Sequence, residues 1–356
     1  MKFLEKLPSC DQHSSNLKHI ISEDIDFHIA RNDEYSNIHD FLEEEAMELG
    51  NFINLRYSRR PNLTESYLES LQIPGLITDK KNNFFGVVSV MSVYRNGEER
   101  KIYYTSDLRI SKRAGIRVRI NFRKMYLNIL RQIDADCFTV VLKENQKAIN
   151  ALTKNKNDLF YHPVHEYVSN SILVLPILRF VGNSLNNIVI KQKRDFDYEI
   201  AKKSNSSFSH GTSDSDTYFV LERDGETVGS FSISRPKNRS LKVEAKSKSM
   251  QMWIKLANII FSHNYDKKIP WVYLTSFIIS DDLDKSECME AILSFLLKSG
   301  FINSGEIFLF CHDKKIEIKP KTFGPNFLTE GIFYKVSLNK HCEKFENSVY
   351  LNPICL

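Results

Sequence analysis

The first half of the chain alternates between two patterns of apolar residues. FFGVVSVMSVY (84–94) and KIYYTSDLRI (101–110) have the composition of strands, and the Asn-Gly in the intervening RNGEER is typical of a hairpin turn. RINFRKMYLNILRQI (119–133) places its apolar residues along one face of a helix. CFTVVL (137–142) follows as a strand and NQKAINALTK (145–154) as a helix. Upstream, we expect a strand at 25–31 and helices at 33–50 and 62–71.

The second half repeats this order of patterns. TYFVLERDGETVGSFSISR (217–235) predicts a hairpin with Asp-Gly at its turn. A helix at 249–262, a strand at 271–279, a helix at 286–300 and further strands at 306–311 and 331–339 follow. Both halves therefore predict an α/β fold of the α+β type, in which a hairpin leads into a central strand, helix and strand.

Short similarities between the halves indicate a duplication. IDFHIAR (25–31) is similar to FDYEIAK (196–202), and YTSDLRIS (104–111) to LTSFIIS (274–280). Both pairs occur in the same order at an offset of roughly 170 residues. We therefore predict two domains, 1–190 and 191–356, with the linker near 185–195. The Ser- and Asp-rich segment 204–216 is expected to be a loop inside the second domain.

Composition limits which ligands and which cellular location we expect for the chain. The 356 residues contain 49 Lys and Arg against 44 Asp and Glu, and this formal charge of +5 gives no strong signal for nucleic-acid binding. The six cysteines form no CxxC pair, so no metal site is expected and the thiols are expected to be reduced. We find no convincing signal peptide and no apolar run long enough to span a bilayer. These features favour a cytoplasmic protein without a membrane partner.

The junction YYTSDLRISKRAGIRVRINF (103–122) carries the clearest chemistry. A strand that turns tightly into a helix directs unpaired N–H groups outward, and the helix dipole adds positive charge, so the junction suits a pyrophosphate. Gly115 permits a close approach, and Lys112, Arg113, Arg117 and Arg119 add positive charge. The corresponding junction of the second half has no Gly and contains Asp281, Asp282 and Asp284.

Three features resemble the GNAT superfamily of N-acyltransferases, in the tandem arrangement of some bacterial members. They are the order of the elements and the two segments SDLRISKRAGIRV (106–118) and TVVLKENQKAINAL (139–152). The resemblance implies two tandem GNAT-like domains, each a mixed, mostly antiparallel sheet flanked by helices. The second domain would be a degenerate copy. It also implies acetyl-CoA, or another acyl-CoA, as co-substrate. The implied cofactor-binding residues are Leu108, Arg109, Ile110, Lys112, Arg113, Ala114, Gly115, Ile116, Arg117 and Asn145.

The resemblance also suggests catalytic residues. Asp107 interrupts an apolar strand beside the cofactor turn and is a candidate general base, although a strand-end Asp can equally cap the turn or pair with Arg109. The family often has a Tyr acid where this chain has Leu152, and Tyr161 is the nearest Tyr downstream. Asn145 can bind cofactor, cap the following helix, or do both.

Further candidates have simpler explanations. Glu43, Glu44 and Glu45 could line an amine-binding groove, but a solvated helix face is the preferred interpretation. His162 and His165 lack a third ligand for a metal, which favours surface or packing roles.

The leading hypothesis is thus an N-acetyltransferase that acts on an amine-bearing small molecule or peptide through its N-terminal half. The alternative is a non-catalytic GNAT-like binding or regulatory module. The basic run between residues 109 and 124 leaves nucleic-acid binding as a third, weaker possibility.

Overall fold

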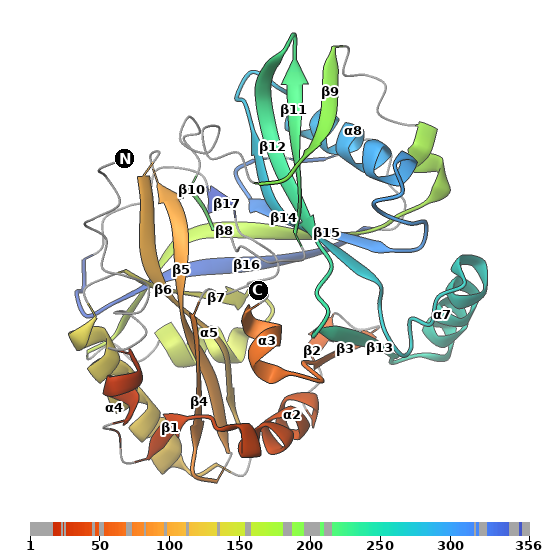
Figure 1. The fold of residues 1–356 in the computed structure, drawn as a ribbon. Coiled ribbons are helices and arrows are strands. Elements are labelled where there is room, and N and C mark those ends of the chain that lie inside the picture. The colour runs from red at the N-terminus through yellow and green to blue at the C-terminus, as the bar shows by residue number, and fades with distance from the viewer. Residues whose placement is uncertain are drawn as a thin grey trace.

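A long mixed sheet runs through both halves of the molecule (Figure 1). Its strands run in the order β1-β4-β5-β6-β7-β16-β8-β15-β14-β12-β11-β9, with the short β10 and β17 attached beside β5. A second sheet has the order β13-β3-β2. The computed structural model describes residues 17–22, 24, 26–44, 47–49, 53–68, 73–81, 83–95, 98–111, 114–133, 136–153, 158–180, 187–195, 207–209, 216–316, 318–319, 326–341 and 349–350.

The first half of the chain contains the predicted hairpin and the central strand, helix and strand. Helices flank its part of the sheet, with α4 on one side and α2 and α3 on the other. The elements are β1 (Phe27–Ile29), η1 (Asn32–Glu34), α2 (Tyr35–Glu44), β2 (Met47–Leu49), β3 (Ile53–Ser58), α3 (Leu63–Leu68), β4 (Ile73–Asp79), β5 (Phe84–Arg95), β6 (Glu98–Ile110), α4 (Ile116–Gln132), β7 (Cys137–Leu142), α5 (Gln146–Thr153), β8 (Phe160–Leu173) and η2 (Pro176–Phe180).

The second half also contains the predicted hairpin, central strand, helix and strand, with an insertion. A strand and a helix, β13 and α7, stand between its hairpin and its central strand. The elements are β9 (Ile188–Lys193), β10 (Ser207–Ser209), β11 (Thr217–Arg223), β12 (Glu226–Ser234), β13 (Ser240–Ala245), α7 (Lys248–Phe261), β14 (Trp271–Ile279), α8 (Lys285–Lys298), β15 (Ile307–Asp313), β16 (Asn326–Ser337) and β17 (Val349–Tyr350).

The two halves exchange strands at the centre of the sheet. β8, which ends the first half, pairs antiparallel with β15 of the second half along Tyr167–Leu173. β16 of the second half pairs antiparallel with β7 of the first, and also with β8. The small sheet joins the halves again, because β3 pairs with β13. The predicted boundary at residue 190 therefore assigns β8 to the first domain, although β8 pairs with β15 and β16 of the second half.

Four clusters of buried side chains surround the sheets. One lies under α8 in the second half, one packs α2 and α3 against β4–β7, and one packs α4 and residues 17–21 against the opposite face. The fourth lies between α7 and the small sheet. Within the described part of the chain, no helix has the length and apolar composition needed to cross a membrane.

Three sequence-based boundaries are wrong. The helix expected at 33–50 ends at Glu44, because Met47–Leu49 form a strand that pairs with β3. In the segment expected to be a loop, Ser207–Ser209 form a strand that pairs with β5 and β17. Residues 188–193, within the expected linker, form the edge strand β9. The strand expected at 196–202 lies outside the described residues.

Candidate functional site

The central strands β6 and β7 separate within their length. They pair in parallel only at Tyr103–Cys137, Tyr104–Phe138 and Thr105–Thr139. Beyond this point β6 continues along β5, and β7 continues along β16. At the last pair, the Thr139 hydroxyl donates to the Thr105 carbonyl at 2.8 Å. The two adjacent parallel strands therefore diverge toward their C-terminal ends, and the region between the diverging strands is called the wedge here.

A β-bulge lies in β6 just past the divergence. Val87 faces Ser106 and Phe85 faces Arg109, so Gly86 alone stands opposite Asp107 and Leu108. Asp107 has a φ of 47°, in the left-handed region that Asp tolerates better than most residues. A bulge removes the extra residue from the hydrogen-bond ladder and redirects the side chains around it.

The bulge decides which way Asp107 points. By strict alternation, Asp107 would share the face of Tyr103 and Thr105, whose side chains meet Tyr126 of α4 or its neighbours. Instead its carboxylate turns to the opposite face. There it accepts a 2.6 Å hydrogen bond from the Tyr67 hydroxyl and forms an ion pair with Arg59.

Arg59, Tyr67 and Asp107 form a compact buried group. Arg59 is 5% exposed, and its guanidinium lies 3.9 Å from the centroid of the Tyr67 ring, a cation–π contact. Burial raises the pKa of Asp107, but Arg59, Arg109 and the Tyr67 hydrogen bond outweigh it and lower that pKa well below its usual range. Burial raises the pKa of Tyr67 well above 10, so its hydroxyl stays protonated and donates.

This geometry bears on both sequence interpretations of Asp107. An ion pair is formed, but chiefly with Arg59, because Arg109 approaches no closer than 4.0 Å. A carboxylate whose pKa is held this low is a weak proton acceptor. The role of Asp107 as a general base stays a prediction, and its contacts suit it better to holding the bulge in place.

The proposed phosphate turn lies at the end of β6. Ile110 ends the strand, and Gly115 precedes the first residue of α4 with an extended backbone and no side chain to cap the helix. Among the described residues, an added Cβ at Gly115 would meet nothing within 4 Å, so they leave space around this position. Ile116 and Arg117 are exposed at the first turn, and Ala114 is half-buried. Lys112 and Arg113 lie outside the described residues.

The second half has a similar strand geometry but a different helix start. β14 and β15 pair in parallel only from Trp271–Ile307 to Tyr273–Leu309, and a register shift in β14 leaves Thr275 unpaired with β12. Asp107 lies four residues after Tyr103, as Thr275 does after Trp271. However, the carboxylate of Asp284 caps α8 by accepting the N–H of Glu287 at 2.9 Å. An anion would have to compete with that carboxylate.

Asn145 and Tyr161 lie away from the bulge. The Asn145 side chain accepts the N–H of Ala148 at 3.0 Å, so it caps α5 as one interpretation predicted. Tyr161 packs against the cluster on the α4 face, edge-to-face with Tyr334 at 6.4 Å. Burial raises the pKa of Tyr161, as does the nearby Cys137. Cofactor and acid roles for these two residues stay predictions.

The two histidines have separate partners. His162 contacts the carbonyl of Asn339 at 2.9 Å, and buried His165 contacts Asp313 at 3.0 Å. Among the described residues, no group of three or more His, Cys, Asp or Glu side chains could hold a metal ion.

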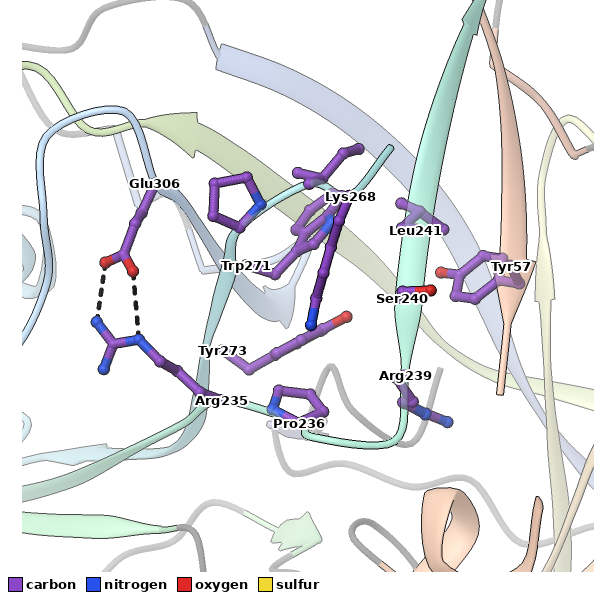
Figure 2. A pocket seen from close by; sticks show the side chains of 12 residues that line it. Tyr57, Arg235, Pro236, Arg239, Ser240, Leu241, Lys268, Trp271, Tyr273 and Glu306 are labelled. Atoms are coloured by element: carbon purple, nitrogen blue, oxygen red, sulfur yellow. Dashed lines mark hydrogen bonds and ion pairs between the residues drawn. The ribbon is translucent and has the colours of Figure 1, made fainter. Parts of the chain in front are cut away.

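A cavity of about 210 Å³ opens close to the buried group, where β14 begins (Figure 2). The stacked rings of Trp271 and Tyr273, with centroids 6.2 Å apart, form one side, and Tyr57 of β3 lies on the other. Its remaining lining residues are Arg235, Pro236, Arg239, Ser240, Leu241, Lys268, Ile269, Pro270 and Glu306.

The charge of the cavity is positive. Arg235 pairs with Glu306 at 2.8 Å at the outer side, as the dashed lines of Figure 2 show. Arg239, which is buried, and Lys268 add two further cations. Arg239 lies within electrostatic range of both Arg59 and Asp107, so the cavity is in the neighbourhood of the buried group. Its walls suit a ligand with an apolar or aromatic part and a negative charge.

Sequence reasoning missed Arg59, Tyr67, Tyr57, Arg239 and Tyr273. Arg59 and Asp107 are far apart in the chain, and the residues around Tyr57 and Tyr273 come from different halves. The run RYSRRP (56–61), with one arginine inside a short strand and two directly after it, was the one local signal.

No protein-family profile and no curated protein matches the chain. In structure it is similar to Saccharomyces cerevisiae N-myristoyltransferase with bound myristoyl-CoA, at 10% identity and a TM-score of 0.48, over 88% of this chain and 83% of that chain. A GCN5-related N-acetyltransferase from Anabaena variabilis has 8% identity and a TM-score of 0.42, over 88% and 72%. A probable N-acyltransferase from Enterococcus faecalis has 8% identity and a TM-score of 0.46, over 87% and 71%.

All three TM-scores lie below 0.5, and all three identities are 10% or lower.

Proposed function

We propose that the protein is an acyl-CoA-dependent N-acyltransferase whose co-substrate binds in the wedge between β6 and β7. One observation carries this proposal: the divergence after Thr105–Thr139, the bulge at Asp107 and the open start of α4 occur together at the C-terminal end of β6. An extended thioester needs a gap between strands, a main-chain donor and an anion site, and these lie in that order along the chain.

The open start of α4 would bind the pyrophosphate of the co-substrate. Backbone N–H groups of the first helical turn and the helix dipole favour an anion there, and the exposed Arg117 and Arg119 add charge. The pantetheine arm would then run along the wedge toward the bulge. Main chain near Leu108, which the bulge removes from regular pairing, would donate to the thioester oxygen.

The reaction is a direct transfer. The neutral amine attacks the thioester carbonyl, a C–N bond forms, the C–S bond breaks, and the proton lost by the amine ends on the coenzyme A thiol. Asp107 would hold the bulge in place rather than accept this proton, because its pKa is low. Proton removal would fall to water in the wedge. Tyr161, the sequence-based candidate for donating to the thiolate, packs in the cluster on the α4 face, away from the bulge. It can donate only if the thiolate reaches that face, and a lower kcat of Tyr161→Phe at unchanged acyl-CoA affinity would show this.

The cavity lined by Trp271, Tyr273 and Tyr57 is proposed to hold the acceptor. Its size suits a side chain or a small molecule, and Arg239 and Lys268 favour an acceptor with a carboxylate besides its amine. An amino acid or a peptide end meets both requirements.

Calorimetric titration with coenzyme A, acetyl-CoA and longer acyl-CoAs tests the first half of the proposal. Binding of at least one thioester at micromolar concentration is expected, and no binding by any of them would refute an acyl-CoA site. A thiol-release assay with amino acids and short peptides then tests transfer.

A second candidate is a non-catalytic acyl-CoA-binding module. It is favoured by the low pKa of Asp107, which leaves the bulge without a titratable base. Binding of acyl-CoA without thiol release for any acceptor would identify it.

A further inference from the structure

Helix α7 projects at one side of the molecule beyond β13 (Figure 1). One of its faces packs on the small sheet, where Ile254, Ala257 and Phe261 contact the cluster of Leu55, Leu241, Tyr265 and Ile269. The structure describes every residue of this helix, and none of them is fully buried. The insertion that distinguishes the second half thus ends in a helix attached along one side only.

The opposite face of α7 is apolar and exposed. Its five large side chains follow helical spacing and form one stripe, called here the α7 stripe. They are Met252 (64% exposed), Trp253 (61%), Leu256 (43%), Ile259 (77%) and Ile260 (62%). Single exposed apolar residues are common on protein surfaces, but five on one helix face indicate a binding surface.

The segment that carries the α7 stripe is positively charged. Residues 246–268 contain five lysines and a single acid, Asp266. Lys248 and Lys255 lie on α7 itself, and Lys267 is exposed shortly after it. An apolar stripe with a Trp, flanked by lysines, is the composition of helices that lie in the interface of an anionic membrane. The anionic headgroups of such a membrane would attract these lysines.

We propose that α7 is a peripheral membrane anchor that inserts its stripe into the surface of an anionic lipid bilayer. The helix axis would lie parallel to the membrane, with Trp253 and Ile259 among the acyl chains and the lysines at the headgroups. This departs from the sequence-based expectation of no membrane partner, which considered only spanning segments and a signal peptide. The proposal does not depend on acyl transfer.

Flotation with vesicles tests the proposal. The full chain should float with vesicles of phosphatidylcholine and phosphatidylserine, weakly with phosphatidylcholine alone, and less at high salt. The double variant Trp253→Gln/Ile259→Gln should reduce binding by about tenfold or more, because two large apolar side chains no longer insert. The matched control Ile177→Gln/Phe180→Gln removes two equally exposed apolar residues outside α7 and should bind normally.

Tryptophan fluorescence gives an independent readout. The chain contains two tryptophans, so Trp271→Phe leaves Trp253 as the sole reporter. Its emission should shift to shorter wavelength on anionic vesicles and be quenched by lipids brominated on the acyl chains. Lys248→Glu/Lys255→Glu should weaken binding to anionic vesicles, whereas Lys193→Glu on β9 should not.

Two results would overturn the proposal. One is the absence of any vesicle binding by the folded full chain. The other is a concentration-dependent dimer in sedimentation that the α7 double variant abolishes, because the stripe would then be covered by a second copy of the chain.

Discussion

The phenol of Tyr67 makes two contacts with one buried ion pair. Its hydroxyl donates to the carboxylate of Asp107 at 2.6 Å, and its ring lies 3.9 Å from the guanidinium of Arg59. Tyr67 therefore contacts both members of the pair: its hydroxyl binds Asp107, and the face of its ring contacts Arg59. Because Asp107 sits in the bulge of β6, α3 and the segment after β3 are tied to the strand that bounds the proposed wedge.

Removing the charge of Asp107 should destabilise the fold strongly. Asp107→Asn leaves the Arg59 guanidinium buried without its counter-charge, and losing one partner of a buried pair typically costs about 3–5 kcal/mol. Urea unfolding measures this cost. Asp40→Asn, which removes the partner of Arg60 in an exposed pair, should change stability by no more than about 1 kcal/mol. Equal effects of the two substitutions would contradict the buried-pair interpretation.

At Gly115, stability and ligand binding should change in opposite directions. Gly115 has an extended backbone and open space around it, so other residues fit without strain. Gly115→Asp supplies a helix cap and should stabilise the protein by roughly a few tenths of a kcal/mol, while its carboxylate repels a pyrophosphate.

Thermal melting and acyl-CoA titration measure the two effects separately. Gly115→Ala adds neither cap nor charge and should keep most of the affinity. Unchanged acyl-CoA binding by a folded Gly115→Asp protein would place the anion site elsewhere.

His39 should make stability depend on pH. Its imidazole is buried in α2, and both ring nitrogens lack a hydrogen-bond partner among the described residues. Burial lowers the pKa of His39, and so does the nearby Arg60. The folded state then binds fewer protons than the unfolded state just below the unfolded pKa of about 6.5, so stability should rise with pH through that window and level off above it.

Urea unfolding at several pH values between about 5 and 7.5 checks this dependence. His39→Leu should flatten the curve, although buried His312, whose pKa burial also lowers, leaves part of the slope. An equal slope in the His39→Leu protein would contradict the prediction.

Gly331 of β16 should tolerate no side chain. It faces Tyr167 of β8, and an added Cβ would overlap the tyrosine ring. Gly331→Ala should therefore destabilise the protein by about 1–3 kcal/mol. The same substitution in a Tyr167→Leu background should cost less, because the ring is gone, and a double-mutant cycle measures the difference. If the effects of the two substitutions are additive, the Tyr167 ring is not the cause of the destabilisation by Gly331→Ala.

Local patterns predicted the elements of the fold better than their partners. The strand composition of 84–94 and 101–110 and the helical spacing in 119–133 depend on neighbouring residues. β5, β6 and α4 formed close to these bounds. The bulge at Asp107 depends on register against Gly86, which no local pattern encodes. The pairing of β8 with β15 joins segments more than a hundred residues apart in the chain.

In the candidate site, too, features with a local sequence signature were predicted and contacts between distant segments were not. Gly115 and Asn145 were found because a helix start has a sequence signature, and Asn145 caps α5. The ion pair of Arg59 with Asp107 has no such signature, because a cation after a strand looks like any exposed arginine. The cavity was also not predictable, because Tyr57 and Tyr273 meet only after the halves have assembled.

Because β8 and β16 each pair with strands of the other half, neither half has a complete sheet on its own. If the backbone were cut between Phe180 and Asn187, the N-terminal piece would keep β8 but lack its neighbours β15 and β16, and the C-terminal piece would lack β7. Each piece alone would expose unpaired strand edges and should aggregate. Expressed together, they should reassemble as a split protein, with acyl-CoA binding restored only when both are present.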